Sequence, residues 1–296
     1  MTKFNKKPTT LSQQVEILKS RGVRIDNASA ERLLLGINYY RFCGYGLFFE
    51  KFGDQGERLD QFKEGTSFNS VYQLYLWDES LRSLLQKYLG KIEVAFRAVL
   101  NYELVTNTQN SHWYLDSSIM VPTFDRATIE TECSEAMDRA VNDMELSASH
   151  FRSAYDEEKY PPCWIISEFF SFGKWSKIFG QLKCKDHKKI VAKFFKAPPD
   201  DFTSWMRALV ILRNRCAHHA RLWNYEFKIK PSQTMAMKRL NINNGRIGIF
   251  AYILHDLLSF SPSDKECFRN DFNNLLLDCP QPYTSALGIP AGFTLK

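Results

Sequence analysis

The chain has 296 residues, of which 44% are hydrophobic and 14% aromatic, so it can bury a core as one large domain or one domain with an extension. Seven cysteines without paired spacing argue against a disulfide framework and favour reduced thiols. The basic N-terminus has no apolar signal-peptide segment, and the longest apolar run, at residues 247–260, is too short to span a membrane. We therefore expect a soluble, cytoplasmic protein with a modest net charge of +6.

The apolar spacing predicts an all-α chain, because steps of three and four residues dominate and period-two alternation is scarce. We expect a first helix at residues 12–21, ended by Gly22, and a second that Asn27 caps and that continues to about Cys43. Ser67 should cap a long helix with apolar positions through residue 100. Residues 125–148 read as one acidic helix, and the prolines before Cys163 as an extended connection into another.

Three segments follow from this pattern. Residues 1–60 are expected to form an N-terminal helical extension, residues 61–260 a helical main domain, and residues 261–296 a C-terminal helix and tail. No repeat or low-complexity segment is evident.

The most informative segment, residues 209–224, reads as part of one amphipathic helix. Its apolar stripe is Trp205, Leu209, Leu212, Cys216, Ala220 and Trp223. At about 100° per residue, Asn214 and His218 lie away from this stripe, and Arg213 lies at its edge.

Arg213, Asn214 and His218 form an R-N-x-x-x-H pattern. An arginine can hold a phosphate, and a histidine can exchange protons near neutral pH. Their spacing alone is also compatible with a structural or merely solvated histidine.

Five blocks along the chain resemble the bacterial Abi-like (AbiD/AbiF) abortive-infection family, and residues 213–218 resemble the R-x-x-x-x-H signature of HEPN-superfamily ribonucleases. The blocks are residues 36–45, residues 62–68 followed by 75–82, and residues 92–97, 162–173 and 212–224. The resemblance implies a HEPN-type helical bundle at residues 61–260 and a toxin of phage defence that cleaves RNA. It also implies that a structured non-coding RNA restrains the toxin.

HEPN nucleases pair two motifs in one composite site, and this chain has one recognisable motif, so the resemblance implies a homodimer. In that site Arg213 would hold the scissile phosphate, His218 would act as general acid or base, and Asn214 would orient the ring or the phosphate. The RNA's own 2′-hydroxyl would be the nucleophile, so no cofactor or metal is expected.

Two basic stretches suit RNA, because phosphate contacts supply most non-specific affinity for nucleic acids. Eight lysines oppose one aspartate between residues 174 and 196, and nine lysines or arginines oppose one glutamate between residues 207 and 246. A solvated lysine-rich face is the competing interpretation. The candidate RNA-binding residues are Arg207, Arg215, Arg221, Lys185, Lys188 and Lys189.

Other residues have two interpretations each. Glu93 and Arg97, four apart, favour an ion pair within one helix over a role in substrate positioning. His219 is expected to be a buried, hydrogen-bonded imidazole on the apolar side of its helix. An aromatic cluster could stack on bases, although we favour a core role for it; its members are Tyr39, Tyr40, Phe42 and Tyr45.

Two other functions stay open. The first is a non-catalytic RNA-binding or adaptor protein that uses the same helical dimer. The second is a metal-dependent DNase, which the sequence supports little, because only Cys216, His218 and His219 cluster and no second group has zinc-like spacing.

Overall fold

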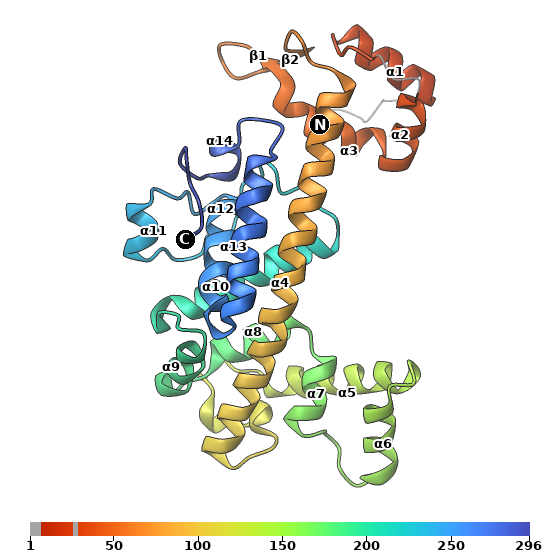
Figure 1. Cartoon of the computed structure of the whole chain (residues 1–296). Helices are drawn as coiled ribbons and strands as arrows, with labels where there is room; N and C mark the ends of the chain where they lie inside the picture. The colour runs from red at the N-terminus through yellow and green to blue at the C-terminus, as the bar shows by residue number, and fades with distance from the viewer. Residues whose placement is uncertain (1–6, 26–28) are drawn as a thin grey trace.

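The computed structural model describes residues 7–25 and 29–296, and within them the all-α prediction is confirmed. The regular structure is almost entirely helical (Figure 1). The only sheet in these residues is an antiparallel hairpin of β1 (Glu50–Phe52) and β2 (Arg58–Phe62).

Helix α4 (Phe68–Thr108) runs through the length of the molecule (Figure 1). Its 41 residues make it about 60 Å long. Ser67 caps it as predicted: the Ser67 hydroxyl accepts from the backbone N–H of Ser70 at 3.0 Å, and the Ser70 hydroxyl accepts from that of Ser67 at 3.1 Å. The helix ends at Gln109, whose φ of 53° is left-handed.

The N-terminal elements gather at the first turns of α4 (Figure 1). Helix α1 (Leu11–Ser20) confirms the first predicted helix. The single helix expected to continue to Cys43 is wrong, because the chain forms α2 (Ala30–Ile37) and α3 (Tyr39–Gly46) instead. Asn38 separates them with a φ of 72°, and its side chain accepts from the Tyr40 backbone to start α3. The expected cap Asn27 lies outside the described residues.

The acidic segment also forms two helices, α5 (Arg126–Asn142) and α6 (Leu146–Ala154), rather than one. Asp125 caps α5, and its carboxylate accepts from the backbone N–H of Thr128 at 3.1 Å. Met144, with a φ of 58°, turns the chain between the two helices. Helix α7 (Cys163–Phe169) follows Pro162 as expected.

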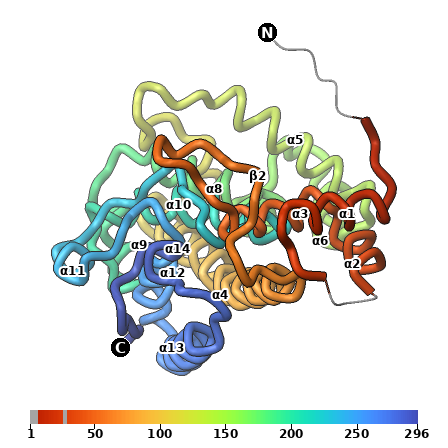
Figure 2. The backbone as a smooth tube through the Cα atoms, turned by 90° about the horizontal axis from the view of Figure 1, so that it is seen from above, coloured from red at the N-terminus to blue at the C-terminus, as the bar shows by residue number. Residues whose placement is uncertain are grey.

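The remaining helices mostly pack along the middle of α4 (Figures 1 and 2). They are α8 (Phe172–Gln181), α9 (Lys185–Phe194), α10 (Pro199–Ala217), α11 (Met235–Arg239), α12 (Ile247–Leu257), α13 (Pro262–Leu277) and α14 (Thr284–Leu287). Short 3-10 turns lie at Leu47–Phe49, Trp113–Leu115, Ser117–Ile119 and Leu258–Phe260.

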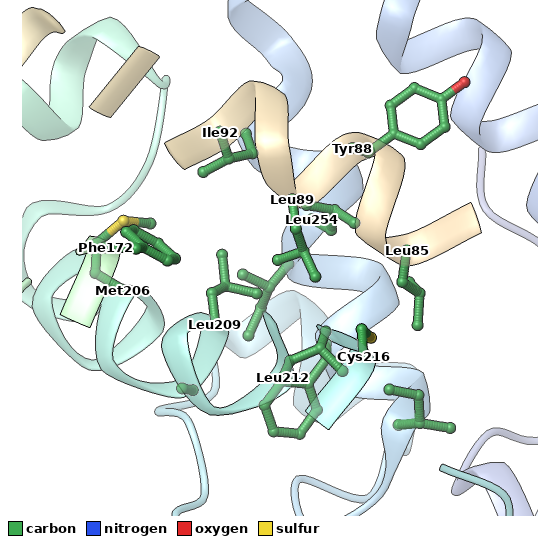
Figure 3. Packing of buried hydrophobic residues seen from close by; sticks show 14 of the residues in the cluster. Leu85, Tyr88, Leu89, Ile92, Phe172, Met206, Leu209, Leu212, Cys216 and Leu254 are labelled. Carbon is green, nitrogen blue, oxygen red and sulfur yellow. The ribbon is translucent and has the colours of Figure 1, made fainter. Parts of the chain in front are cut away.

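Helix α10 packs on α4 through an apolar interface (Figure 3). Leu209 and Leu212 of α10 point toward Leu85 and Leu89 of α4, and all four side chains are fully buried. They belong to one hydrophobic cluster with members from Val15 to Leu295. The boundaries that we expect at residues 60 and 260 stay a prediction.

None of the helices within residues 7–25 and 29–296 combines the length and the apolar character that a membrane span requires.

Candidate functional site

Helix α10 carries Arg213 and Asn214, but it ends at Ala217, so the helix expected to continue through Trp223 is wrong. His218 is its C-cap, and His219 follows with a left-handed φ of 53°. The N–H of Ala220 donates to the Arg215 carbonyl at 2.8 Å and that of His219 to the Cys216 carbonyl at 3.0 Å. These two bonds form the Schellman end of a helix, made here without glycine.

A buried carboxylate accepts hydrogen bonds from the backbone of the turn that follows α10. Asp78 of α4, which is fully buried, accepts from the backbone N–H of Trp223 at 2.8 Å and from that of Leu222 at 3.2 Å. Its other partners are the Tyr45 hydroxyl of α3, at 2.6 Å, and the Arg82 guanidinium. Burial raises the pKa of Asp78, and the charge of Arg82 opposes that rise. This network ties together α3, α4 and the turn after α10.

Arg213 is held from α4 by Glu93. The Arg213 Nε lies 3.2 Å from Glu93 Oε2, and Nη1 donates to the Asn214 side-chain oxygen at 3.4 Å. The expected ion pair of Glu93 with Arg97 is therefore wrong, since Arg97 donates to the Ser167 carbonyl at 2.7 Å instead. Within the described residues no bond engages Nη2 of Arg213, so this nitrogen is available to donate to a ligand such as a phosphate.

Asn214 and His218 are both exposed at this end of α10. The His218 backbone N–H donates to the Asn214 carbonyl at 3.0 Å, so the two residues lie one helical turn apart. In the part of the chain that the structure describes, the His218 imidazole makes no hydrogen bond and faces solvent. The structure thus exposes Asn214 and His218 one helical turn apart, and it places Arg213, which Glu93 holds, next to Asn214.

The role expected for His219 is wrong. Its side chain is exposed rather than buried, because the left-handed turn rotates it away from the apolar face of α10. Its carbonyl accepts from the Arg41 guanidinium of α3. His219 also lines a pocket of about 420 Å³ between α3 and the turn after α10.

Two of the other arginines near the site are engaged within the protein. The Arg215 guanidinium lies 3.3 Å from the centre of the Tyr225 ring and donates to the Arg221 carbonyl at 2.5 Å, and burial lowers its pKa. Arg221 donates to the Gly44 carbonyl of α3. Arg207 is exposed on α10, six residues before Arg213.

The three candidate lysines lie at the opposite end of α10 from His218. Helix α9 carries them and adjoins the start of α10, where Phe195 stacks on Phe202. The 19 residues of α10 separate its two ends by about 28 Å. Lys188 donates to the Gly180 carbonyl at 2.8 Å, Lys189 pairs with Asp186 at 3.3 Å, and Lys185 is exposed.

Within the described ranges, no three His, Cys, Asp or Glu side chains lie close enough to hold a metal ion. Cys216 is buried, and burial raises the pKa of its thiol to about 12, whereas His218 and His219 are exposed.

The core role that we favour for the aromatic cluster is confirmed for Phe42 and Tyr45, which are buried, and for Tyr39, which packs against the core. Tyr40 is different, because 87% of it is exposed.

Two partners of the site were not assigned from the sequence. Asp78 had a detectable signal: it falls between Leu74 and Leu81 on the apolar stripe of α4, where a carboxylate needs buried partners. The sequence carries no signal for the pairing of Glu93 with Arg213, because 120 residues separate them.

An all-α chain with an Arg–Asn–His cluster at the exposed end of a core helix matches one family model. The model of the Abi-like protein family covers residues 32–224, about two thirds of the chain. The chain belongs to the Abi-like protein family. This membership indicates a role in abortive infection, a form of phage defence. Comparison with curated proteins and with solved structures finds no significant match.

Proposed function

We propose that this protein is a metal-independent endoribonuclease toxin of the HEPN type that cleaves RNA through Arg213, Asn214 and His218. The observation that carries the proposal is the pairing of an anchored Arg213 with an exposed His218 one turn and a half further along the chain. Family membership supports it, because abortive infection requires an activity that stops growth of the infected cell.

The chemistry needs a phosphate clamp and proton transfer. Arg213 donates from its free Nη2 to a non-bridging oxygen of the scissile phosphate, while Glu93 holds its Nε. One imidazole removes the proton of the 2′-hydroxyl, whose oxygen attacks phosphorus. The bond from phosphorus to the 5′-oxygen breaks, and that oxygen takes up a proton from a second imidazole. The products are a 2′,3′-cyclic phosphate and a 5′-hydroxyl.

In this proposal the second imidazole comes from a second copy of the chain, as in the composite site of HEPN nucleases. The exposure of His218 and Asn214 at the end of α10 supports this dimer, because a two-fold axis beside them would bring two His218 side chains to one linkage. The chain has a mass of 34.5 kDa, and light scattering should therefore give about twice that mass for the active species. A strictly monomeric active enzyme contradicts the composite site.

The direct test is cleavage of RNA by the purified protein in EDTA. General acid–base catalysis contributes about 10²–10⁴-fold, so His218→Ala should nearly abolish cutting without loss of fold. The matched control is His150→Ala, which removes another exposed histidine, on α6. If His218→Ala cuts at the parental rate, His218 is not the catalyst. RNA binding without any cutting supports an adaptor protein instead.

The proposal also includes a structured RNA that restrains the toxin in the cytoplasm. The support is the number of exposed cations, among them Arg207 and Lys185, together with kinship. Protein purified without nuclease treatment should retain RNA, with a high 260/280 absorbance ratio that RNase removes. A preparation that never carries RNA weakens this part.

A further inference from the structure

The pocket between α3 and the turn after α10 has a distinctive lining. Arg41, Arg58, Arg221 and His219 contribute cationic or ionisable groups, and among the described residues no carboxylate lines it. The apolar part of the wall comes from residues such as Leu47 and Ala220. Its volume of about 420 Å³ lies in the range of small-ligand sites.

Two of these charges are uncompensated. Arg58 forms a bidentate pair with Glu50, at 2.6 and 2.7 Å, so its charge is balanced. Arg41 and Arg221 instead donate to the carbonyls of His219 and Gly44. A carbonyl satisfies a donor but leaves the positive charge, and no carboxylate of the described residues pairs with either arginine. The pocket therefore favours an anion.

An aromatic ring lies at the same pocket. Tyr40 belongs to the lining, yet 87% of it is exposed, although large aromatic side chains are usually covered. Its ring is available to stack on a planar ligand. A phosphate site beside an unoccupied aromatic face fits a nucleotide better than a bare anion.

The pocket adjoins the proposed cleavage site. His219 lines it and follows His218 directly, so the two Cα atoms are about 3.8 Å apart. Arg41 holds the carbonyl of that same residue, which fixes the pocket relative to the catalytic imidazole.

We propose that this pocket binds the nucleotide of the substrate RNA strand that flanks the cleaved linkage, with Arg41 on its phosphate and Tyr40 stacked on its base. This inference rests on the proposed function for the position of the cut, but the binding itself is independent of catalysis. It gives the N-terminal helices a role in reading the RNA strand.

The test measures binding of a labelled single-stranded RNA by full-length His218→Ala protein in EDTA, which removes the cleavage step. Loss of one stacked base should make Tyr40→Ala bind about tenfold more weakly, whereas Tyr40→Phe keeps the stacking and the parental affinity. Arg41→Gln should reduce the slope of log K against log salt by about 0.7, the value for one phosphate contact on a single strand. Arg139→Gln, which removes an exposed cation on α5, outside both basic stretches, should leave this slope unchanged.

Equal affinities of Tyr40→Ala and Tyr40→Phe would overturn the proposal, and so would equal salt slopes of Arg41→Gln and Arg139→Gln. Thermal unfolding of each variant confirms that the fold is retained. The two failures are distinguishable. If the parental protein cuts RNA but these variants bind RNA normally, the pocket assignment is wrong and the nuclease proposal is retained. If the variants lose affinity for RNA but the parental protein never cuts it, the nuclease proposal is wrong and the pocket assignment is retained.

Discussion

The Glu93 carboxylate lies 3.2 Å from the Arg213 Nε, so a residue in the middle of α4 sets the direction of the arginine that we propose as the phosphate clamp. Only 13% of the Glu93 side chain is exposed, which strengthens this pairing relative to one at the surface. Glu93 acts through Arg213 and is a positioning residue.

We expect Glu93→Ala to lower the single-turnover cleavage rate about tenfold, because a charge-assisted hydrogen bond that orients Arg213 is lost. Glu93→Gln keeps an oxygen acceptor and should lose less. Both variants remove a negative charge near the phosphate and should bind RNA more tightly than the parental protein. Glu64→Gln, an exposed control, should change neither quantity. Unchanged cleavage by Glu93→Ala would mean that Arg213 needs no such anchor.

Asp78 is the second structural anchor, and its loss should destabilise the fold. Asp78→Ala leaves the buried Arg82 uncompensated and two backbone N–H groups without an acceptor. Breaking such a pair costs about 3–5 kcal/mol, which corresponds to a fall in Tm of about 5–8 °C for a chain of this length. The exposed control Asp54→Ala should leave Tm nearly unchanged.

The double variant Asp78→Ala/Arg82→Met separates the two contributions. It removes the unpaired charge as well, so its loss of stability should be smaller than the sum of the two single losses. A simple additive loss would show that the Asp78–Arg82 pair is not energetically coupled.

His255 of α12 should make stability depend on pH. It is 5% exposed, and burial, with further effects of Lys265 and Arg269, lowers its pKa to about 4. The unfolded chain binds the proton below about 6.5, whereas the folded chain does not until about 4. The free energy of unfolding should therefore fall by about 2 kcal/mol from this group as the pH drops from about 7 to about 5.

Urea unfolding of the parental protein and of His255→Phe at these two pH values isolates that contribution. Toward acid pH the free energy of unfolding of the parental protein should fall relative to that of the variant, because the variant has no imidazole to protonate when it unfolds. A difference that is constant with pH would mean that His255 takes up its proton equally in both states.

Substitutions of Arg215 and Arg207 should have different effects on stability and on RNA binding, although both residues are arginines of α10. Arg215→Lys loses the stacking on Tyr225 and should reduce stability by about 1–2 kcal/mol, while its retained charge leaves the salt dependence of RNA binding unaltered. Arg207→Gln should keep stability within about 0.5 kcal/mol but lower the salt slope by about 0.7. Denaturation and RNA-binding titrations of the two variants check this contrast. A stability loss in Arg207→Gln together with a lower salt slope in Arg215→Lys would contradict these assignments.

Local signals in the sequence predict much of this fold. Ser67 caps α4 as its side chain predicts, and the apolar stripe of α10 is buried as its spacing indicates. The helix ends after Ala217 and at Asn38 were missed, because non-glycine residues in the left-handed conformation make both turns and local propensity does not indicate them. The partners of Asp78 and Arg213 come from distant segments, so only the folded chain identifies them.

The most direct test of the central claim uses an RNA in which one 2′-hydroxyl, at the linkage that the protein cuts, is replaced by hydrogen. We predict that cleavage in EDTA stops at that linkage alone and that neighbouring linkages still yield 2′,3′-cyclic phosphate ends. Cutting of the substituted linkage at the parental rate, or cutting that requires a divalent metal, would contradict attack by the 2′-oxygen at the Arg213–His218 site.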